Sequence, residues 1–186
     1  MQQQSRLNAP RLTAEALRTV RLDLLPLRVA HAEEMAAVLS DPSLHTFIGG
    51  APDTPQALHS RYQRMTAGSP DPSVTWLNWV IRHRDEACLT GTVQATIGPS
   101  GPGPGLIAEI AWVVGTAWQG RGIATEAARE LVAWLSRQPV PVQAVIAHIH
   151  PEHQASAAVA TAAGLTPTDE WHDGEIRWFR QIGRTK

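Results

Sequence analysis

Gln119-Gly120-Arg121-Gly122-Ile123-Ala124 stands between an apolar run that ends at Val114 and an alanine-rich amphipathic segment. A strand, a glycine turn and a helix in this order bring backbone N–H groups to a helix N-terminus, where they bind anions. The two glycines let the backbone approach a ligand closely, and Arg121 adds a permanent positive charge. We therefore interpret this stretch as a cradle for a pyrophosphate.

The segments on either side of the cradle predict a β-α-β unit. Leu106 to Val114 is apolar except for Glu109, and Val142 to Ile149 is a second apolar, β-branched run. The helix between these runs is closed by Pro139 and Pro141, and one apolar stripe follows it at helical spacing: Ile123, Ala127, Leu131 and Leu135. A helical crossover joins parallel strands, so we expect these two strands to be parallel.

The rest of the chain predicts two further helices before this unit, and a helix and a hairpin after it. The N-terminal half is expected to contain a strand near Val20 to Leu25, a helix from Val29 to Leu39 ended by Asp41-Pro42, a helix from the N-cap Thr54 to Gly68, and strands at Val74 to Ile81 and Cys88 to Ile97. The C-terminal half is expected to contain a loop from Gly98 to Gly105, a helix from Pro151 to Ala163 stopped by Gly164, and a hairpin turning at Asp173-Gly174.

Length and composition favour one compact domain of 186 residues, with residues 1–18 as a poorly ordered lead-in and 19–186 as the folded part. The net charge of −1 and the lack of a dense Lys/Arg cluster argue against nucleic acid or an anionic membrane as a partner. Cys88 is the only cysteine, and the N-terminus lacks the apolar core of a signal peptide. We expect a cytoplasmic protein.

Two commoner glycine motifs do not fit the cradle. Gly115 and Gly120 have the offset of a P-loop, but Arg121 replaces its lysine and Gly122 replaces the hydroxyl residue that binds Mg²⁺. A dinucleotide-binding loop is also excluded, because there is no G-x-G-x-x-G and no acidic residue closes the next strand.

Gln119, Gly122 and Ala124 form the pattern Q-x-x-G-x-A, which resembles the acyl-CoA-binding signature of the GNAT N-acetyltransferase superfamily. The resemblance extends over about residues 19 to 180. Thr19-Val20-Arg21-Leu22 with Leu27-Arg28 looks like the first strand of that family, and Glu109-Ile110-Ala111-Trp112 looks like its fourth. Pro151-Glu152-His153-Gln154-Ala155-Ser156, followed by Gly164-Leu165, is similar to the P-E-N-x-A-S…G-F segment of the branch that contains the ribosomal-protein alanine N-acetyltransferases.

The resemblance implies an α+β fold of three layers, α/β/α. Its central sheet is mixed and mostly antiparallel, with the parallel fourth and fifth strands splayed apart. It also implies acetyl-CoA, or another acyl-CoA, as cosubstrate and no metal. The pantetheine arm is expected along the open edge of the fourth strand, and the pyrophosphate on the helix that begins near Ile123. The implied cofactor-binding residues are Trp112, Val113, Val114, Gln119, Gly120, Arg121, Gly122, Ile123, Ala124 and His153.

Two residues are candidates for catalysis. Glu109 is interpreted either as the base, acting through a water, or as an ordinary carboxylate at the exposed end of a strand. Ser156 corresponds to a serine that the resembling branch places near the CoA sulfur, although a serine here can also serve only the start of the helix. Ala160 stands where many GNAT enzymes carry a tyrosine acid. His153 replaces the usual asparagine; it can still donate one hydrogen bond to the cofactor but is bulkier.

These features predict transfer of an acyl group, most simply acetyl, to a primary amine of a peptide N-terminus or a small molecule. The alternative is a CoA-binding module without turnover, which Ala160 and His153 suggest. A homodimer is left open. His148, His150 and His153 do not make a metal site, because no carboxylate or cysteine completes it. Trp76, Trp79 and Trp112 are either core residues or the lining of an acceptor cleft.

Overall fold

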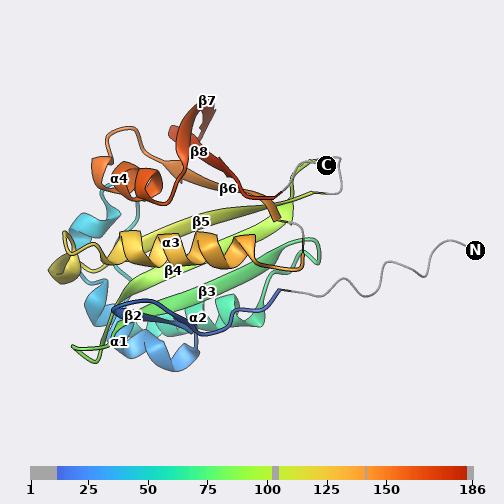
Figure 1. The fold of residues 1–186 in the computed structure, drawn as a ribbon. Helices are drawn as coiled ribbons and strands as arrows, with labels where there is room; N and C mark the ends of the chain where they lie inside the picture. Colours follow the sequence, from blue (N-terminus) through green and yellow to red (C-terminus); the bar gives the residue numbers. More distant parts are fainter. Residues whose placement is uncertain (1–11, 102–104, 141, 184–186) are drawn as a thin grey trace, which may run out of the picture.

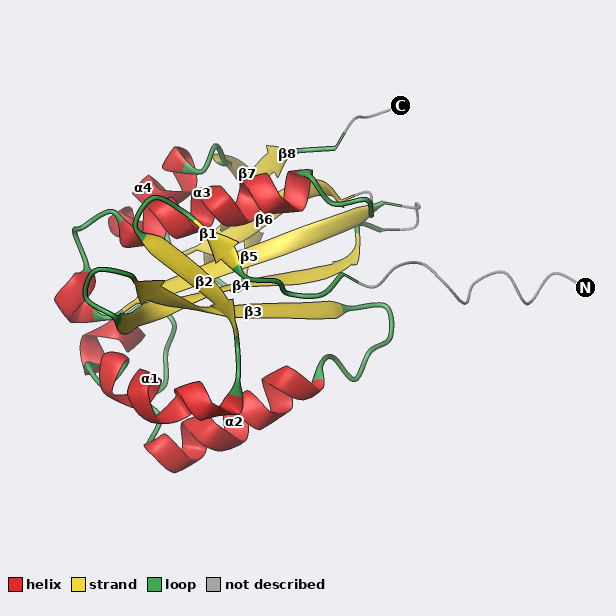
Figure 2. Cartoon of the chain, turned by 60° about the horizontal axis from the view of Figure 1, so that its bottom comes forward, coloured by secondary structure: helices red, strands yellow, loops and turns green. Residues whose placement is uncertain are grey.

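The computed structural model describes residues 12–101, 105–140 and 142–183. One eight-stranded sheet has the order β1-β2-β3-β4-β5-β6-β8-β7 and is antiparallel except for the β5–β6 pair. Helices α1 and α2 cover one face of the sheet, and α3 and α4 cover the other (Figures 1 and 2). This three-layer arrangement confirms the predicted fold class. The strands are β1 (Leu17–Arg18), β2 (Leu22–Pro26), β3 (Thr75–His83), β4 (Cys88–Pro99), β5 (Leu106–Val114), β6 (Val142–Ile149), β7 (Thr166–His172) and β8 (Glu175–Gln181).

The helices follow the patterns that predicted them. They are α1 (Ala32–Val38), α2 (Pro55–Ala67), α3 (Ile123–Ser136) and α4 (Gln154–Ala162). The Thr54 side chain accepts a hydrogen bond from Ala57 N–H at the start of α2, which confirms the predicted N-cap. The apolar stripe of α3 is buried against the sheet and contributes Ile123, Ala127, Leu131 and Leu135 to the larger hydrophobic core. A second core lies under α1 and α2.

The parallel strands β5 and β6 separate part-way along their length. Their pairing runs from Leu106 with Val142 to Glu109 with Ile146. Beyond these residues, β5 and β6 are no longer paired with each other. This is the predicted splaying. Between the strands, α3 crosses the sheet on one face (Figure 1).

Four boundaries differ from the predictions. The first strand was placed at Val20 to Leu25, but β2 starts at Leu22 and Val20 is 89% exposed in a turn, where the Thr19 hydroxyl bonds to Leu22. The predicted loop at Gly98 starts later, because Gly98 and Pro99 still pair with β5. Val29–His31 is a 3-10 turn ahead of α1, and α4 starts at Gln154 because His153 caps it.

The predicted N-terminal lead-in falls into two parts. Residues 1–11 lie outside the described residues, as do 102–104 of the predicted loop, Pro141 and 184–186. Residues 12–18 pack on the domain: Leu17 is buried, and the indole N–H groups of Trp79 and Trp134 both donate to Glu15. At the other end of the chain, Asp173 (φ 48°) and Gly174 (φ 83°) form the turn between β7 and β8 with the predicted left-handed conformations.

Candidate functional site

A cleft of about 810 Å³ opens where β5 and β6 separate. Its walls come from the free halves of both strands, the start of α3, the start of α4 and the segment between α1 and α2. Every predicted cofactor-binding residue except Arg121 lines it, and so does Ser156. The residues that the sequence placed in one site are therefore together in space.

The glycine loop points free backbone N–H groups at this cleft. Gly120 and Gly122 have φ of 74° and 76°, which glycine adopts at little cost. The first intrahelical bond of α3 runs from Glu126 N–H to the Gly122 carbonyl (3.0 Å), so the amides from Ile123 to Thr125 precede it. Gln119 ties the loop to the strand, because its side-chain amide donates to the Val114 carbonyl at 3.0 Å.

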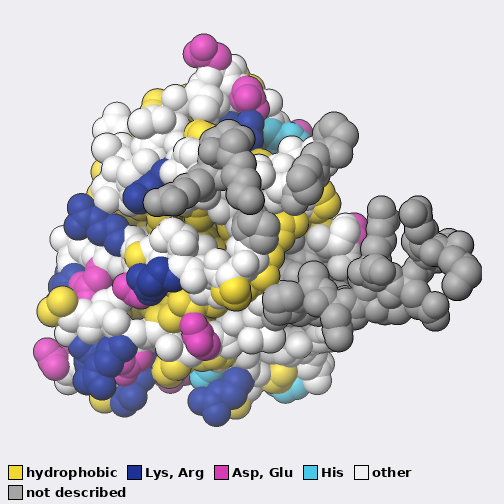
Figure 3. Space-filling model, turned by 45° about the vertical axis from the view of Figure 1, so that its right-hand side comes forward, with side chains coloured by type: hydrophobic (Ala, Val, Ile, Leu, Met, Phe, Trp, Pro, Cys, Tyr) yellow, Lys and Arg dark blue, Asp and Glu magenta, His cyan; other side chains and the backbone are white. Residues whose placement is uncertain are grey.

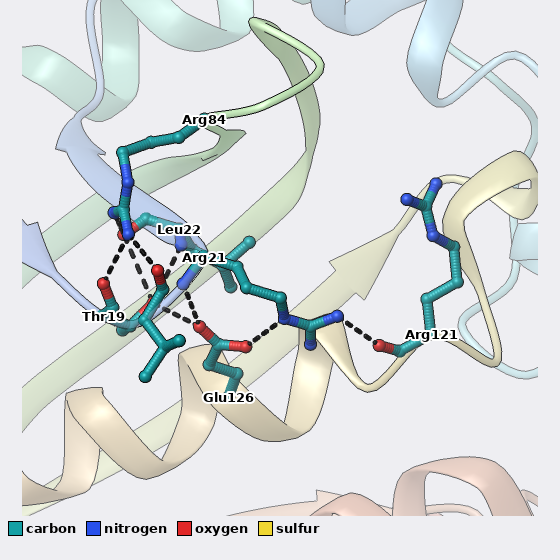
Figure 4. Close-up of polar contacts among 7 residues, drawn as sticks. Thr19, Arg21, Leu22, Arg84, Arg121 and Glu126 are labelled. Carbon is teal, nitrogen blue, oxygen red and sulfur yellow. Dashed lines mark hydrogen bonds and ion pairs between the residues drawn. The ribbon is translucent and has the colours of Figure 1, made fainter.

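The loop is held from the side by the turn between β1 and β2 (Figure 4). Glu126 in the first turn of α3 accepts from the Thr19 hydroxyl (2.5 Å), from Arg21 N–H (2.8 Å) and from Arg21 Nε (2.8 Å). Arg21 Nη1 then donates to the Arg121 carbonyl at 3.0 Å. Arg84, the residue that follows β3, holds the same turn by donating to the Leu22 carbonyl and to Asp23.

Arg21 also neutralises an acid that would otherwise oppose anion binding. Burial alone would raise the pKa of Glu126, but the hydrogen bonds from Thr19 and Arg21 outweigh it and lower that pKa. Glu126 is therefore ionised at neutral pH and paired with the Arg21 guanidinium. The helix N-terminus keeps its positive character, because the negative charge beside it is matched.

Arg121 differs from its predicted role. Its guanidinium is paired with Glu86 in the β3–β4 turn, away from the cleft lining, and Figure 4 shows it turned away from Arg21. This hydrogen bond lowers the pKa of Glu86. Glu86 also accepts from the indole of Trp118 at 3.3 Å, so one carboxylate holds two residues of the loop. Arg121 thus supports the loop and does not add its charge to the cradle in this structure.

The free half of β5 offers backbone donors to the cleft. Gly115 N–H bonds to Thr90 on the β4 side (2.8 Å), and alternate N–H groups of a strand point in opposite directions. The N–H groups of Trp112 and Val114 therefore point to the open side, beyond the last β5–β6 pair at Glu109. An extended ligand arm can pair with this edge as a further strand.

Ser156 is tied to His153 at the start of α4. Ser156 N–H donates to His153 Nδ1 (3.3 Å), and the Ser156 hydroxyl lies 3.1 Å from His153 Nε2. Because Nδ1 accepts, the neutral ring carries its proton on Nε2 and donates it to the hydroxyl oxygen. Burial, with the nearby His150, lowers the pKa of His153 and favours this neutral form. Phe47 stacks on the His153 ring at 4.4 Å.

Glu109 lies on the face of the sheet that α1 and α2 cover, where the paired part of β5 ends. Its Oε1 is 2.8 Å from Nδ1 of His148 on β6. The side chain of Glu109 is 47% exposed and that of His148 is 15% exposed. In the part of the chain that the structure describes, His148 lines the cleft and Glu109 stands behind it.

A second cavity of about 500 Å³ adjoins the cleft under α1 and α2. The two share Leu44, Ile48, Ala111, Trp112 and Val113. Asn78, Gln94 and Ala111 are in register across β3, β4 and β5 and form part of its floor. Three tryptophans were candidates for lining an acceptor cleft. Trp79 and Trp112 line this cavity, whereas Trp76 lies outside it and is 37% exposed.

The acetyltransferase (GNAT) domain family matches residues 21–166 of this sequence. The chain belongs to this family. Among curated proteins, none matches the sequence. The prediction of the family made from Gln119, Gly122 and Ala124 is confirmed.

Solved structures share the fold along nearly the whole chain. One is RimL, a ribosomal L7/L12 alpha-N-protein acetyltransferase in complex with coenzyme A (TM-score 0.72, 16% identity, 90% of this chain and 98% of that chain). Another is the acetyltransferase from Agrobacterium tumefaciens (0.66, 23%, 93% and 98%). A third is the microcin C7 self-immunity acetyltransferase MccE in complex with acetyl-CoA and AMP (0.69, 17%, 88% and 94%). At these identities the likeness shows the fold alone; ribosomal-protein acetyltransferases are among these neighbours.

The described residues contain neither a helix that could span a membrane nor a metal-binding cluster. None of the helices in the described ranges is both long and apolar enough to span a membrane. Within the same ranges, no group of three or more His, Cys, Asp or Glu residues is placed to hold a metal ion. On the face drawn in Figure 3, positive and negative side chains are interspersed.

The structure adds site residues that the sequence patterns did not single out. Phe47 carries no local signal, because it comes from the segment between α1 and α2 and reaches α4 only through the fold. Arg21 and Glu126 are 105 residues apart in the chain. The sequence patterns raised His148 only as a metal ligand. Ile146, two residues before it on β6, is the register partner of Glu109, so the side chains of His148 and Glu109 lie on the same face.

Proposed function

We propose that this chain is an acetyl-CoA-dependent N-acetyltransferase that acts on a primary amine of a peptide N-terminus or a small molecule. The observation that carries the proposal is the cleft between the separated strands. It joins an anion cradle at the start of α3 to a carboxylate–imidazole pair on the other side of the sheet. The single cysteine, Cys88, is compatible with the cytoplasm, which we propose as the compartment.

The cradle fits a pyrophosphate. A Cβ atom placed on Gly120 would meet no heavy atom within 4 Å, so the space beside the loop is open. The amides from Ile123 to Thr125 face it, and Glu126 is neutralised by Arg21. The edge N–H groups of Trp112 and Val114 would hold the pantetheine arm and polarise the thioester carbonyl.

Acetyl-CoA supplies an activated acetyl thioester, and the residues of this chain orient it and handle protons. The Ser156 hydroxyl accepts a hydrogen bond from His153 Nε2, so its own proton is available for the departing sulfur. A thiol has a pKa near 8.5 and leaves readily as thiolate, so a strong acid is not required. This accounts for a site in which the fully buried Ala160 stands at the position of the tyrosine acid.

Glu109 is the residue that we propose for removal of the amine proton. It is a carboxylate at the point where β5 leaves β6, beside the free edge that would hold the thioester. A lysine-like amine with a pKa near 10.4 is neutral only about once in a few thousand molecules at pH 7, so proton removal matters most for such acceptors.

The cavity under α1 and α2 is the proposed place for the substituent of the amine. It shares the wall formed by Ala111, Trp112 and Val113 with the cleft, so an amine held there reaches the thioester edge. Its lining is mainly apolar and includes Leu58, Met65 and Trp79. Arg61 at this cavity is already paired with Asp53. We therefore propose acceptors whose amine adjoins an apolar group.

The test is release of CoA thiol from acetyl-CoA over a panel of amines. The panel includes short peptides with apolar or charged N-terminal residues, and small amines. We expect release that requires both an amine and folded protein. Binding of acetyl-CoA with no release for any amine would favour the alternative, a CoA-binding module. An unchanged melting temperature with acetyl-CoA would contradict both functions.

A further inference from the structure

His148 and Glu109 form a pair that spans the two separated strands. Glu109 is the last residue of β5 that pairs with β6, and His148 lies two residues beyond its register partner Ile146. Side chains two residues apart on a strand share a face, so His148 leans back over the junction to reach the carboxylate. The 2.8 Å contact joins Glu109 Oε1 to His148 Nδ1.

The contact determines where a proton sits on the His148 ring. An ionised carboxylate only accepts hydrogen bonds, so Nδ1 must carry the proton that it donates. The neutral ring then has its lone pair on Nε2. Among the described residues, none makes a hydrogen bond with Nε2, and His148 lines the cleft whereas Glu109 does not. The group of this pair that faces the reaction space is the imidazole.

We propose that His148 Nε2 is the atom that accepts the proton of the amine, and that Glu109 is a positioning residue which orients the ring and stabilises its charged form. This assignment rests on the proposed acetyltransferase function, and within it His148 replaces Glu109 as the group that takes the amine proton. An imidazole titrates near neutral pH, which suits a general base better than an exposed carboxylate does.

The protons and electrons of the reaction balance among the amine, the thioester, His148 and Ser156. The ammonium of the acceptor gives one proton to His148 Nε2 and keeps the electron pair. That pair forms the new C–N bond to the acetyl carbon while the C–S bond breaks, and the sulfur leaves with its electrons. The second proton of the amine nitrogen passes to the sulfur by way of the Ser156 hydroxyl. The imidazolium returns its proton to solvent.

The charged groups around His148 come from three strands. Glu109 on β5 contacts the ring directly. Arg177 on β8 is its register partner, but the guanidinium is engaged with Glu170 on β7. His172 on β7 has its ring centre 5.3 Å away, and Glu175 at the start of β8 lines the cleft. The one described group that bonds to the ring is thus the carboxylate, which favours the protonated ring after proton transfer.

The test compares His148→Gln and His148→Ala with wild type, using an amine of high pKa from the active panel. Glutamine can still donate to Glu109 but cannot act as a base, so we expect kcat/KM to fall by about 100-fold or more. Acetyl-CoA affinity and melting temperature should stay near the wild-type values. Added imidazole should restore part of the activity of His148→Ala and leave wild type unchanged.

Glu109→Gln tests the positioning role, because its carbonyl can still accept from Nδ1 while the charge is lost. We expect kcat to fall while the KM for acetyl-CoA stays at the wild-type value, and the fall to be smaller than in His148→Gln. His59→Asn is the control, since His59 is exposed on α2 and lines neither the cleft nor the adjoining cavity; its kcat and KM should match wild type.

Failure of the proposed function and failure of the His148 assignment give different results. If wild type releases no thiol with any amine, the proposed function itself is wrong. If wild type turns over and His148→Gln keeps the wild-type kcat/KM, the assignment of His148 alone is overturned. An equal loss in His59→Asn, or loss of acetyl-CoA binding in His148→Gln, would also contradict it.

Discussion

Replacement of Glu126 by glutamine tests whether the β1–β2 turn holds the start of α3. The carboxylate accepts three hydrogen bonds, from the Thr19 hydroxyl, Arg21 N–H and Arg21 Nε. Glutamine keeps one oxygen, which can serve the first two, and turns an amino group toward Arg21 Nε. One charge-assisted hydrogen bond is lost, which is about 1.5–3 kcal/mol for such bonds in general. The Arg21 side chain is 38% exposed, so screening by water reduces this to about 1–2 kcal/mol.

Calorimetry or circular dichroism measures this loss as a lower melting temperature. For a chain of this length about 1 kcal/mol corresponds to about 2–4 °C, so we expect a decrease of about 2–8 °C at pH 7. Because the pKa of Glu126 is lowered by folding, its contribution is complete above the ordinary value of 4.5 and is lost as the pH falls through the folded value. The difference between variant and wild type should therefore shrink below pH 4.5.

Glu130→Gln is the control, because Glu130 lies on the same helix and makes a surface ion pair with Arg137. That pair is worth little, so its melting temperature should stay within about 1–2 °C of wild type. Equal effects of the two variants, or a difference for Glu126→Gln that persists unchanged well below pH 4.5, would refute the reasoning.

Three further outcomes follow from the site. Ser156→Ala should lower kcat by no more than about 100-fold, because a thiolate leaves readily. Its acetyl-CoA affinity should be unchanged, because the backbone N–H of residue 156 still bonds to His153. A loss of acetyl-CoA binding in a calorimetric titration would contradict this role. Met65→Trp should fill the cavity under α2 and raise the KM for the amine while leaving acetyl-CoA affinity unchanged, and an unaltered KM would remove the cavity as the acceptor site. Phe47→Ala should lower the melting temperature by about 1–6 °C, since an aromatic pair contributes about 0.5–1.5 kcal/mol, and no change would mean that its stacking on His153 does not stabilise the fold.

The sequence pattern was sufficient to predict those parts of the site that depend on local backbone conformation. Gln119, Gly122 and the apolar stripe of α3 specify a strand, a left-handed turn and a helix within a short stretch, and the structure has all three. The same holds for the hairpin turn at Asp173-Gly174. These turns could be predicted from the sequence because few other backbone conformations accommodate these residues.

The direction of long side chains could not be predicted in this way. Arg121 is next to the cradle in sequence, yet its guanidinium goes to Glu86 in a hairpin 35 residues earlier. The Glu109–His148 contact depends on the register of two parallel strands and on the point at which they part. The error at Val20 has a similar cause, because the turn there is fixed by Arg84 of the β3–β4 turn, which donates to the carbonyls of Thr19 and Val20.

The most direct test of the central claim is a calorimetric titration of acetyl-CoA into the wild-type chain and into Gly122→Val. Gly122 has φ of 76°, and a Cβ there would approach Arg21 Nη2 to 3.4 Å, so valine both strains the loop and crowds the Arg21 side chain that supports it. Gly68→Val is the matched control, because Gly68 has a similar positive φ of 89°, a Cβ there would meet no heavy atom within 4 Å, and Gly68 lines neither the cleft nor the adjoining cavity. The account predicts saturable binding to wild type and to the control, and none to a folded Gly122→Val. Equal binding by all three proteins, or no binding by wild type, would contradict it.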